Sequence, residues 1–130
     1  MNVVVTGGTD GIGLSLVKKL LNLNHKVFMI GKDTIKAEKI LRSLNNKNLE
    51  FFNCDLSEKH QIKKLIDTLN KIKILDVLVN NAGALFEKKT INSQGVEKTF
   101  ALNHLSYLQL SLGLIENLEK SEIARIINVS

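Results

Sequence analysis

The chain has 130 residues, of which 44% are hydrophobic and 24% are charged, a balance typical of one globular domain and not of a disordered tail or a fibre. No apolar run approaches the roughly 20 residues of a membrane helix, and the N-terminus leaves no room for the apolar stretch of a signal peptide. A single cysteine cannot form an internal disulfide, which suits a reducing compartment. We therefore expect a cytoplasmic protein without a membrane span.

The net charge of +5 does not by itself predict a nucleic-acid partner. Of the eighteen basic residues only Arg42 and Arg125 are Arg, and no basic block carries interleaved aromatic residues. Lys, Asn and Ile are abundant and proline is absent, as A+T-rich coding sequence would produce. We attribute the charge to genome composition and predict no nucleic-acid binding.

Five short apolar runs predict buried strands, at residues 3–5, 26–30, 50–53, 75–79 and 125–129. Apolar residues at helical spacing separate the first four runs: Leu14, Leu16, Val17, Leu20 and Leu21, then Ala37, Ile40, Leu41 and Leu44, then Ile62, Leu65, Ile66 and Leu69. Asp33 or Thr34 is expected to cap the second helix and Ser57 the third, and one long helix is expected over residues 96–120. This alternation predicts an α/β domain whose parallel sheet is covered on both faces, with ligands at the carboxyl ends of the strands.

A glycine-rich segment follows the first predicted strand. Residues 6–13 read TGGTDGIG, which places Gly7, Gly11 and Gly13 in the spacing G-x-x-x-G-x-G. Glycine allows a tight strand-to-helix turn and a close approach of the backbone to a phosphate, and the following helix presents free N–H groups. A turn that needs glycine only for its geometry is the alternative. Because the segment joins a strand to a helix at the start of a βαβ unit, we predict dinucleotide binding.

Further motifs extend this pattern along the whole chain. They are Asp55-Leu56 after the third strand, NNAG at residues 80–83, GVEKTFALNHL at residues 95–105 and RIINVS at residues 125–130. Together with TGGTDGIG they resemble, in this order, the classical short-chain dehydrogenase/reductase family, in its retinol-dehydrogenase-like branch. The resemblance implies a Rossmann-type doubly wound parallel sheet with five strands in the order 3-2-1-4-5. It covers about the first half of a typical member, so we expect residues 1–130 to be an NAD(P)-binding domain that ends at the fifth strand.

The resemblance also assigns the cofactor-binding residues. Those that would hold the pyrophosphate and the adenosine ribose are Thr6, Gly7, Thr9, Gly11, Ile12 and Gly13. Asp55 would accept a hydrogen bond from the adenine amino group beside the Leu56 backbone, although it could also be a solvated strand end or a helix cap. Asn81, Ala82 and Gly83 would line the adenosine side. The amides of Asn80 and Asn81 could equally tie adjacent strands together.

Cofactor choice is expected to be set after the second strand, where an acid reads the ribose 2′-hydroxyl and a base accommodates a 2′-phosphate. Gly31 stands where NAD-preferring relatives carry Asp, and Lys32 stands where NADP-preferring relatives often carry Arg. Two carboxylates oppose this assignment. Asp33 could be the ribose acid, and Asp10 occupies a position that many NADP enzymes fill with Arg or Lys. We predict NADP and keep NAD as the alternative.

Asn103 matches the asparagine of the family's Asn-Ser-Tyr-Lys catalytic tetrad, which helps to hold a water in a proton relay. The alternative is a satisfied polar residue that bends a buried helix. We expect Tyr107 and His104 to pack on the helix, because Tyr107 is followed four residues later by Ser111 and not by Lys. Cys54 is expected to be a small buried hydrophobe, and no metal site is predicted.

The resemblance implies hydride transfer between the nicotinamide and a small apolar alcohol or carbonyl substrate. Because Y-x-x-x-K does not occur in the sequence, we expect this chain alone to be inactive. A catalytically silent module that binds NADP(H) or a partner is the alternative function. The resemblance further implies a possible homodimer formed through the helix expected over residues 96–120.

Overall fold

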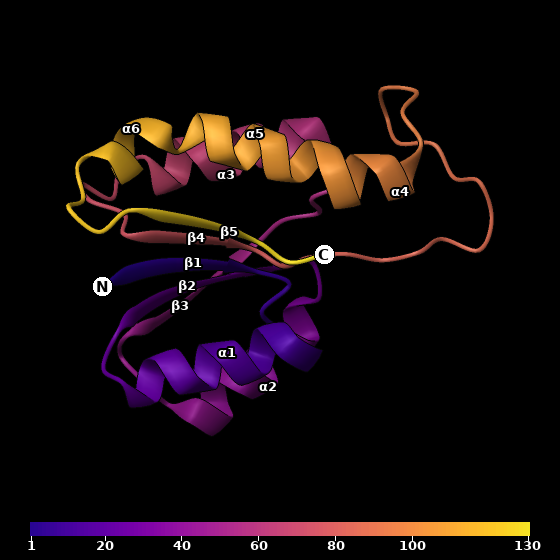
Figure 1. The fold of residues 1–130 in the computed structure, drawn as a ribbon. Coiled ribbons are helices and arrows are strands. Elements are labelled where there is room, and N and C mark those ends of the chain that lie inside the picture. The colour runs from indigo at the N-terminus through magenta and orange to yellow at the C-terminus, as the bar shows by residue number, and fades with distance from the viewer.

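A five-stranded parallel sheet forms the centre of the molecule, in the order β3-β2-β1-β4-β5 (Figure 1). The computed structural model describes residues 1–130 in full. The strands are β1 (Asn2–Thr6), β2 (Lys26–Gly31), β3 (Leu49–Asn53), β4 (Val77–Asn80) and β5 (Arg125–Asn128). The helices are α1 (Gly11–Asn22), α2 (Thr34–Leu44), α3 (Lys59–Leu69), α4 (Lys98–Phe100), the π-helix η1 (Ala101–Leu105), α5 (Ser106–Gly113) and α6 (Ile115–Glu119). This is the predicted Rossmann-type doubly wound fold with the predicted strand order.

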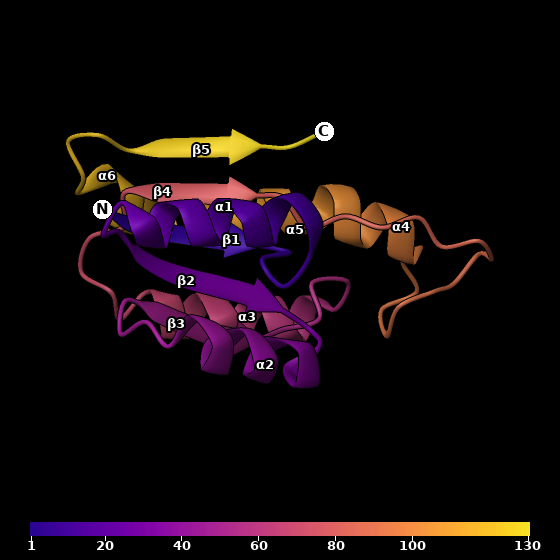
Figure 2. The same cartoon turned by 90° about the horizontal axis from the view of Figure 1, so that it is seen from below.

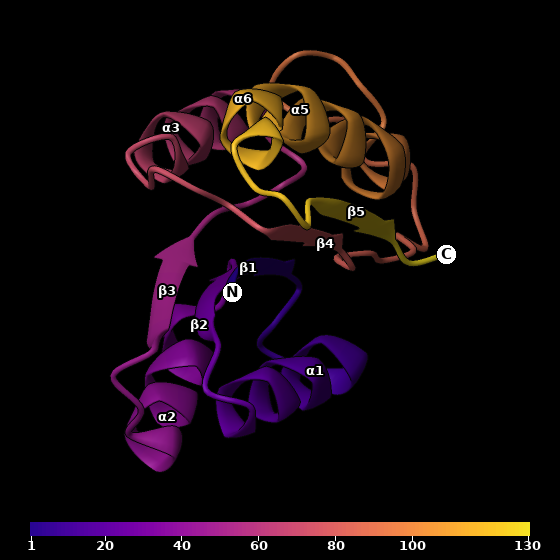
Figure 3. The same ribbon diagram turned by 60° about the vertical axis from the view of Figure 1, so that its left-hand side comes forward.

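The helices form two layers, one on each face of the sheet. Helices α1 and α2 cover one face, and α3, α5 and α6 cover the other (Figure 3). Successive strand residues point to opposite faces, so Val3 and Val5 pack with α1 and α2 while Val4 packs on the opposite side. The result is two separate apolar clusters that share the strands as a common wall. None of the helices combines the length and the apolar character needed to cross a lipid bilayer.

Local sequence signals determine most of the element boundaries. The predicted strands are all present, although β4 begins at Val77, two residues later than expected. Of the two candidate caps of α2, the structure selects Asp33, whose Oδ1 accepts the Lys36 N–H at 2.9 Å. Of the apolar residues predicted to face the core in α3, Ile62, Leu65 and Leu69 are buried and Ile66 is partly buried.

The prediction that Ser57 caps α3 is wrong. Glu58 is the N-cap residue of this helix, and it forms no side-chain capping bond. The Ser57 hydroxyl instead donates to Asp55 Oδ1 at 2.7 Å, because the carboxylate two residues earlier competes for it. The serine is therefore part of the loop after β3 and not of the helix.

The single helix expected over residues 96–120 is also wrong. Glu97 starts the helical segment by accepting the N–H groups of Thr99 and Phe100, a π-turn occupies Ala101–Leu105, and the helix breaks after Gly113. A Cβ at Gly113 would lie 2.4 Å from Ile66 Cδ1, so the glycine that interrupts the helix also lets α5 approach α3 closely. The periodicity of the sequence did not reveal either interruption.

The strand β5 lies at one edge of the sheet, and all four of its residues are exposed (Figure 2). It pairs with β4 on one side only. Ile126 and Ile127 are among its exposed side chains. An apolar strand edge of this kind is a template for pairing with another strand.

Two of the three leucines of α5, Leu110 and Leu112, face opposite environments and provide a test of the packing. Leu110 has 0% exposure and Leu112 has 65%. We expect Leu110→Ala to lower the free energy of unfolding by about 2–5 kcal/mol, because it leaves a cavity between α5 and the sheet. The matched variant Leu112→Ala should change it by less than about 0.5 kcal/mol when both are measured at a protein concentration low enough to keep the chain monomeric. Urea unfolding followed by circular dichroism measures both, and similar losses in the two variants would contradict the assigned orientation of α5.

Candidate cofactor site

The candidate site lies where the sheet order reverses, at the carboxyl ends of β1 and β4. From β1 the chain moves outward to β2 and β3, whereas β4 and β5 lie on the other side of β1. Open α/β sheets bind their ligands at such a switch point. Two hollows open there, one of about 160 Å³ towards β2 and β3 and one of about 670 Å³ towards β5. We call them the adenosine hollow and the outer hollow.

The glycine segment after β1 folds tightly on itself. Gly13 lies so close to the preceding turn that a Cβ would stand 2.1 Å from the Gly7 carbonyl oxygen. Gly7 and Gly11 both have positive φ, of 65° and 49°. A Cβ at Gly7 would meet the backbone of Ala82, whereas a Cβ at Gly11 would meet nothing within 4 Å. Gly7 and Gly13 are therefore required by packing, and the surface over Gly11 is left open to a ligand.

Helix α1 begins at this open surface. The N-cap residue Asp10 engages two N–H groups at its start: Oδ1 accepts the Gly11 N–H at 2.8 Å and the carbonyl accepts the Leu14 N–H at 3.0 Å. The N–H groups of Ile12 and Gly13 face an anion-binding position at the positive end of the helix dipole. The residues present thus fit a pyrophosphate group. Asp10 adds a negative charge nearby, but its Oδ2 is paired with Lys36 Nζ at 2.9 Å.

Thr6 and two asparagines join the strands at the site. The buried Thr6 hydroxyl donates to Val79 O at 3.3 Å and accepts the N–H groups of Asn81 and Ala82 at 2.9 and 3.0 Å. The Asn81 amide donates to Thr6 O and Gly7 O, which ties the loop after β4 to β1. Asn80 reaches in the opposite direction, to Asn128 Oδ1 of β5 at 2.9 Å. Both asparagines therefore tie strands together, as one of the two hypotheses expected. Thr6 is buried below the site and holds the loop after β4 through its hydroxyl.

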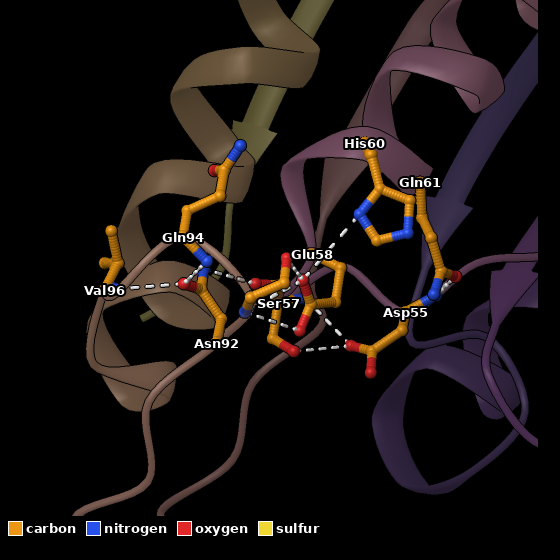
Figure 4. Close-up of polar contacts among 9 residues, drawn as sticks. Asp55, Ser57, Glu58, His60, Gln61, Asn92, Gln94 and Val96 are labelled. Carbon is orange, nitrogen blue, oxygen red and sulfur yellow. Dashed lines mark hydrogen bonds and ion pairs between the residues drawn. The ribbon is translucent and has the colours of Figure 1, made fainter.

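Asp55 lines the adenosine hollow, and Figure 4 shows its polar contacts with the residues that follow it. Its Oδ1 accepts the Ser57 N–H at 2.9 Å and the Ser57 hydroxyl at 2.7 Å, and its own N–H donates to Gln61 Oε1 at 2.7 Å. Oδ2 accepts no hydrogen bond from the protein. Partial burial alone would raise the pKa of Asp55, but the bonds from Ser57 and the charges of Lys32 and Lys98 outweigh burial and lower it. Asp55 is thus an ionised acceptor with one free oxygen.

The end of β2 carries the residues expected to select the cofactor. Gly31 lies against Thr9, and a Cβ there would be 2.9 Å from Thr9 Cγ2. Lys32 lines the adenosine hollow and is exposed. Asp33 uses its carboxylate to cap α2. Of the three residues, Lys32 offers an ammonium group that forms no ion pair, whereas Asp33 has Oδ1 engaged in the cap and Oδ2 without a protein donor.

Asn103 faces the outer hollow from the π-turn. Its Oδ1 accepts the Ala84 N–H and its Nδ2 donates to Ala84 O, both at 2.9 Å. This two-bond clamp holds the loop after β4 and leaves one lone pair and one N–H of the amide free. The role of Asn103 in a proton relay stays a prediction, while the bend in the helix agrees with the alternative.

Tyr107 does more than pack on its helix. Its hydroxyl lies 2.9 Å from Ala82 O and 3.2 Å from Val129 O, at the ends of β4 and β5. Partial burial raises the pKa of Tyr107. His104 is exposed and stacks on Phe100, with ring centroids 5.1 Å apart. Cys54 is buried as expected, and burial raises the pKa of its thiol to about 12.

Most of the predicted residues gather around the two hollows. The adenosine hollow is lined by the predicted Gly7, Thr9, Lys32, Asp55, Leu56, Ala82 and Gly83, and the outer hollow by Ile12, Asn81, Gly83 and Asn103. Sequence analysis missed Phe86 and Leu102, which also line the adenosine hollow. Leu102 lies in the π-helix η1 and Phe86 lies in an irregular loop, so neither belongs to a periodic pattern that would have identified it.

The comparisons with known proteins agree with this geometry. A family model described as short chain dehydrogenase matches residues 1–130. The chain belongs to the short-chain dehydrogenase family. Among members of this oxidoreductase family, the Homo sapiens proteins dehydrogenase/reductase SDR family member 12 and polyprenol dehydrogenase are 36% and 35% identical to it. Both alignments cover 98% of this chain, which spans only 41% of the length of each relative.

Solved structures of short-chain dehydrogenases share the fold. A metagenomic short-chain oxidoreductase in complex with NADP superimposes with a TM-score of 0.83 at 28% identity, and covers 100% of this chain and 61% of its own. The RhlG/NADP complex from Pseudomonas aeruginosa has a TM-score of 0.80, also at 28% identity, over 96% of this chain and 52% of its own.

The lowered pKa of Asp55 makes a prediction about acid stability. The carboxylate contributes stability that is fully present above its unfolded pKa of about 3.9 and is lost as the pH falls through the lower folded value. Asp55→Asn keeps an acceptor for Ser57 but cannot titrate. We expect its free energy of unfolding, measured by urea at a series of pH values from about 6 to 2, to decline less with acid than that of the unaltered protein. Asp67→Asn, at an exposed position on α3, is the control, and equal acid slopes in all three proteins would refute the assignment.

Proposed function

We propose that this chain is the cofactor-binding part of an NAD(P)-dependent oxidoreductase that transfers hydride between the nicotinamide and an alcohol or carbonyl carbon. The observation that carries the proposal is the open surface over Gly11 at the start of α1, which adjoins the hollow that holds Asp55. The first-turn N–H groups would bind the pyrophosphate, and Asp55 Oδ2 would accept a hydrogen bond from the adenine amino group. The cofactor, when bound, supplies or accepts the hydride.

A small apolar substrate is the second part of the proposal. The outer hollow is lined in part by Ile12, Leu85 and Val129, and it lies on the side of the site away from Asp55. Two relatives support the apolar character of the substrate, but not its small size, through their names, since polyprenol dehydrogenase and retinol dehydrogenase 12 of Mus musculus, 35% and 31% identical, are named for apolar alcohols. The names of the relatives give no support to a catalytically silent module.

We further propose that residues 1–130 bind the cofactor without turning over substrate. Asn103 is the one member of the family tetrad that we assign within them, and no Tyr is followed four residues later by Lys. Without such a pair, nothing in the chain provides a tyrosine whose proton transfer to the substrate oxygen is assisted by lysine.

We also propose a cytoplasmic location, which the buried, unpaired Cys54 supports.

NADP is the cofactor that the β2 end fits best. Gly31 has no carboxylate and is covered by Thr9, and Asp33 is held at the start of α2 by the cap that its Oδ1 forms. The exposed ammonium of Lys32 can pair with a 2′-phosphate. Asp10 would repel that phosphate, but Lys36 compensates its charge. The two 28% identical neighbours solved with NADP add support.

The test measures the affinities of the protein for NADPH and for NADH by isothermal titration calorimetry. We expect NADPH to bind more tightly. Lys32→Gln should weaken NADPH binding by about tenfold through loss of a charge-assisted bond and leave NADH binding unchanged. Asp10→Asn should strengthen NADPH binding, because it leaves the positive charge of Lys36 uncompensated near the 2′-phosphate. Lys47→Gln, at an exposed site in the loop before β3, is the charge-matched control. If the folded protein bound neither cofactor, the proposed function would be wrong; a preference for NADH would overturn only the choice of NADP.

We also propose a homodimer formed through the outer face of the helices from α4 to α6. Phe100, Leu108, Leu112 and Ile115 are exposed there at helical spacing. Such a stripe of large apolar residues is typical of a protein interface.

The oligomeric state in solution tests this interface. We expect sedimentation velocity to show a concentration-dependent dimer that Leu112→Lys shifts to monomer, because a lysine in an apolar interface would lose hydration without gaining a partner. Leu23→Lys, at an exposed leucine after α1, should leave the dimer intact. A monomer at all concentrations, or equal disruption by both variants, would argue against this interface.

A further inference from the structure

The loop between β4 and α4 is fastened to the loop that carries Asp55. Its returning half, residues 90–97, folds against Ser57 and Glu58 at the start of α3 (Figure 4). Ser93 donates from both its N–H and its hydroxyl to the Glu58 carboxylate. The outgoing half of the same loop supplies Phe86 to the adenosine hollow. The loop thus lines the proposed adenine position with its outgoing half and holds the residues that follow Asp55 with its returning half.

Asn92 is the buried centre of this attachment, and its side-chain amide performs two tasks. Oδ1 accepts the N–H groups of Gln94 and Val96, both at 2.9 Å, and so closes the turn at the tip of the returning half. Nδ2 points out of the turn and donates to Ser57 O at 2.9 Å. An acceptor alone would close the turn, so the donor on the same side chain has a separate role: it holds Ser57.

Ser57 passes this constraint to Asp55. It is buried, and while its carbonyl is held by Asn92, its N–H and hydroxyl both bind Asp55 Oδ1. Asp55 cannot turn without giving up two hydrogen bonds, and its other oxygen, Oδ2, is the one left without a protein donor. The orientation of the free oxygen therefore depends on a contact made by a residue that does not line the adenosine hollow.

We propose that Asn92 is a positioning residue for adenine recognition. By holding Ser57 through the carbonyl, it keeps Asp55 turned so that Oδ2 is available to the 6-amino group of the purine. This inference rests on the proposed function, because it assigns to Asp55 the role of adenine acceptor. It makes the returning half of the loop part of the base-selecting apparatus and not only a connection between β4 and α4.

The test compares two nucleotides that differ only in the group that Asp55 would read. They are AMP and purine riboside 5′-monophosphate, which lacks the 6-amino group, and their affinities are measured by NMR titration. In the unaltered protein we expect AMP to bind about tenfold more tightly, the worth of one hydrogen bond to a charged acceptor. Asn92→Asp keeps the acceptor that closes the turn but loses the donor to Ser57. It should reduce the ratio to about twofold or less and change the affinity for the 6-unsubstituted nucleotide by less than about twofold.

The control variant is Asn46→Asp. The Asn46 Oδ1 closes a similar turn by accepting the Asn48 N–H at 2.9 Å, in the loop before β3 at the opposite end of the sheet. The Asn46→Asp variant should therefore leave the ratio of the two nucleotide affinities unchanged. If Asn92→Asp does not fold, Asn92→Ser serves the same purpose, because its hydroxyl can close a turn but is too short to reach Ser57 O.

The outcomes separate the inference from the proposal beneath it. A loss of affinity for both nucleotides by the same factor would show that Asn92 is only structural. Equal binding of both nucleotides by the unaltered protein would show that Asp55 does not read the amino group and would also overturn the inference. If the folded protein bound neither nucleotide, the proposed function, binding of an adenine dinucleotide cofactor, would itself be wrong.

Discussion

The contact between the loop after β1 and the loop after β4 is the constraint on which the site depends. Three donors and acceptors meet at the Thr6 hydroxyl, which binds Val79 O and the N–H groups of Asn81 and Ala82. Above it, the Gly7 backbone lies so close to Ala82 that any side chain at position 7 would collide with it. Both hollows are built around this junction, so the threonine most deeply buried beneath the site determines the shape of the surface above it.

The regular elements were largely predictable because their signals are local and repeated. Continuous β-branched and aliphatic runs identified the strands, and three- and four-residue spacing identified the inner faces of α1, α2 and α3. The helix after Val96 was not predictable in the same way. At its π-helix, Asn103 is hydrogen-bonded to Ala84, and next to its break Gly113 lies against Ile66. Neither partner is a neighbour of the helix in the sequence. The spacing of apolar residues indicates which side of a helix is buried, but it does not indicate where the backbone hydrogen-bonding pattern of the helix changes.

The roles of the acidic residues were harder to predict than their positions. Asp10, Asp33 and Asp55 all follow strands at the same end of the sheet. In the structure the first pairs with Lys36, the second caps α2, and the third is held by Ser57 with one oxygen free. Sequence spacing placed each of them near the cofactor site, but the distinction between a committed and an available carboxylate depends on partners within hydrogen-bond distance. The same limitation applied to Ser57. It was predicted to cap α3, but its hydroxyl donates to the Asp55 carboxylate instead.

The strand order has a consequence for the order in which the site can be assembled. Strands β1 to β3 and helices α1 and α2 occur within the first 53 residues and enclose an apolar cluster with few later contributors. The loop after β1 nevertheless requires Asn81 and Ala82, which are 75 and 76 residues further along than Thr6. During synthesis, which proceeds from the N-terminus, the glycine segment therefore exists for a time beside a folded half-sheet without the strand that gives it its shape. The proposed phosphate-binding surface therefore takes its shape with the closure of the sheet across β1 and β4 and not with the synthesis of the motif itself.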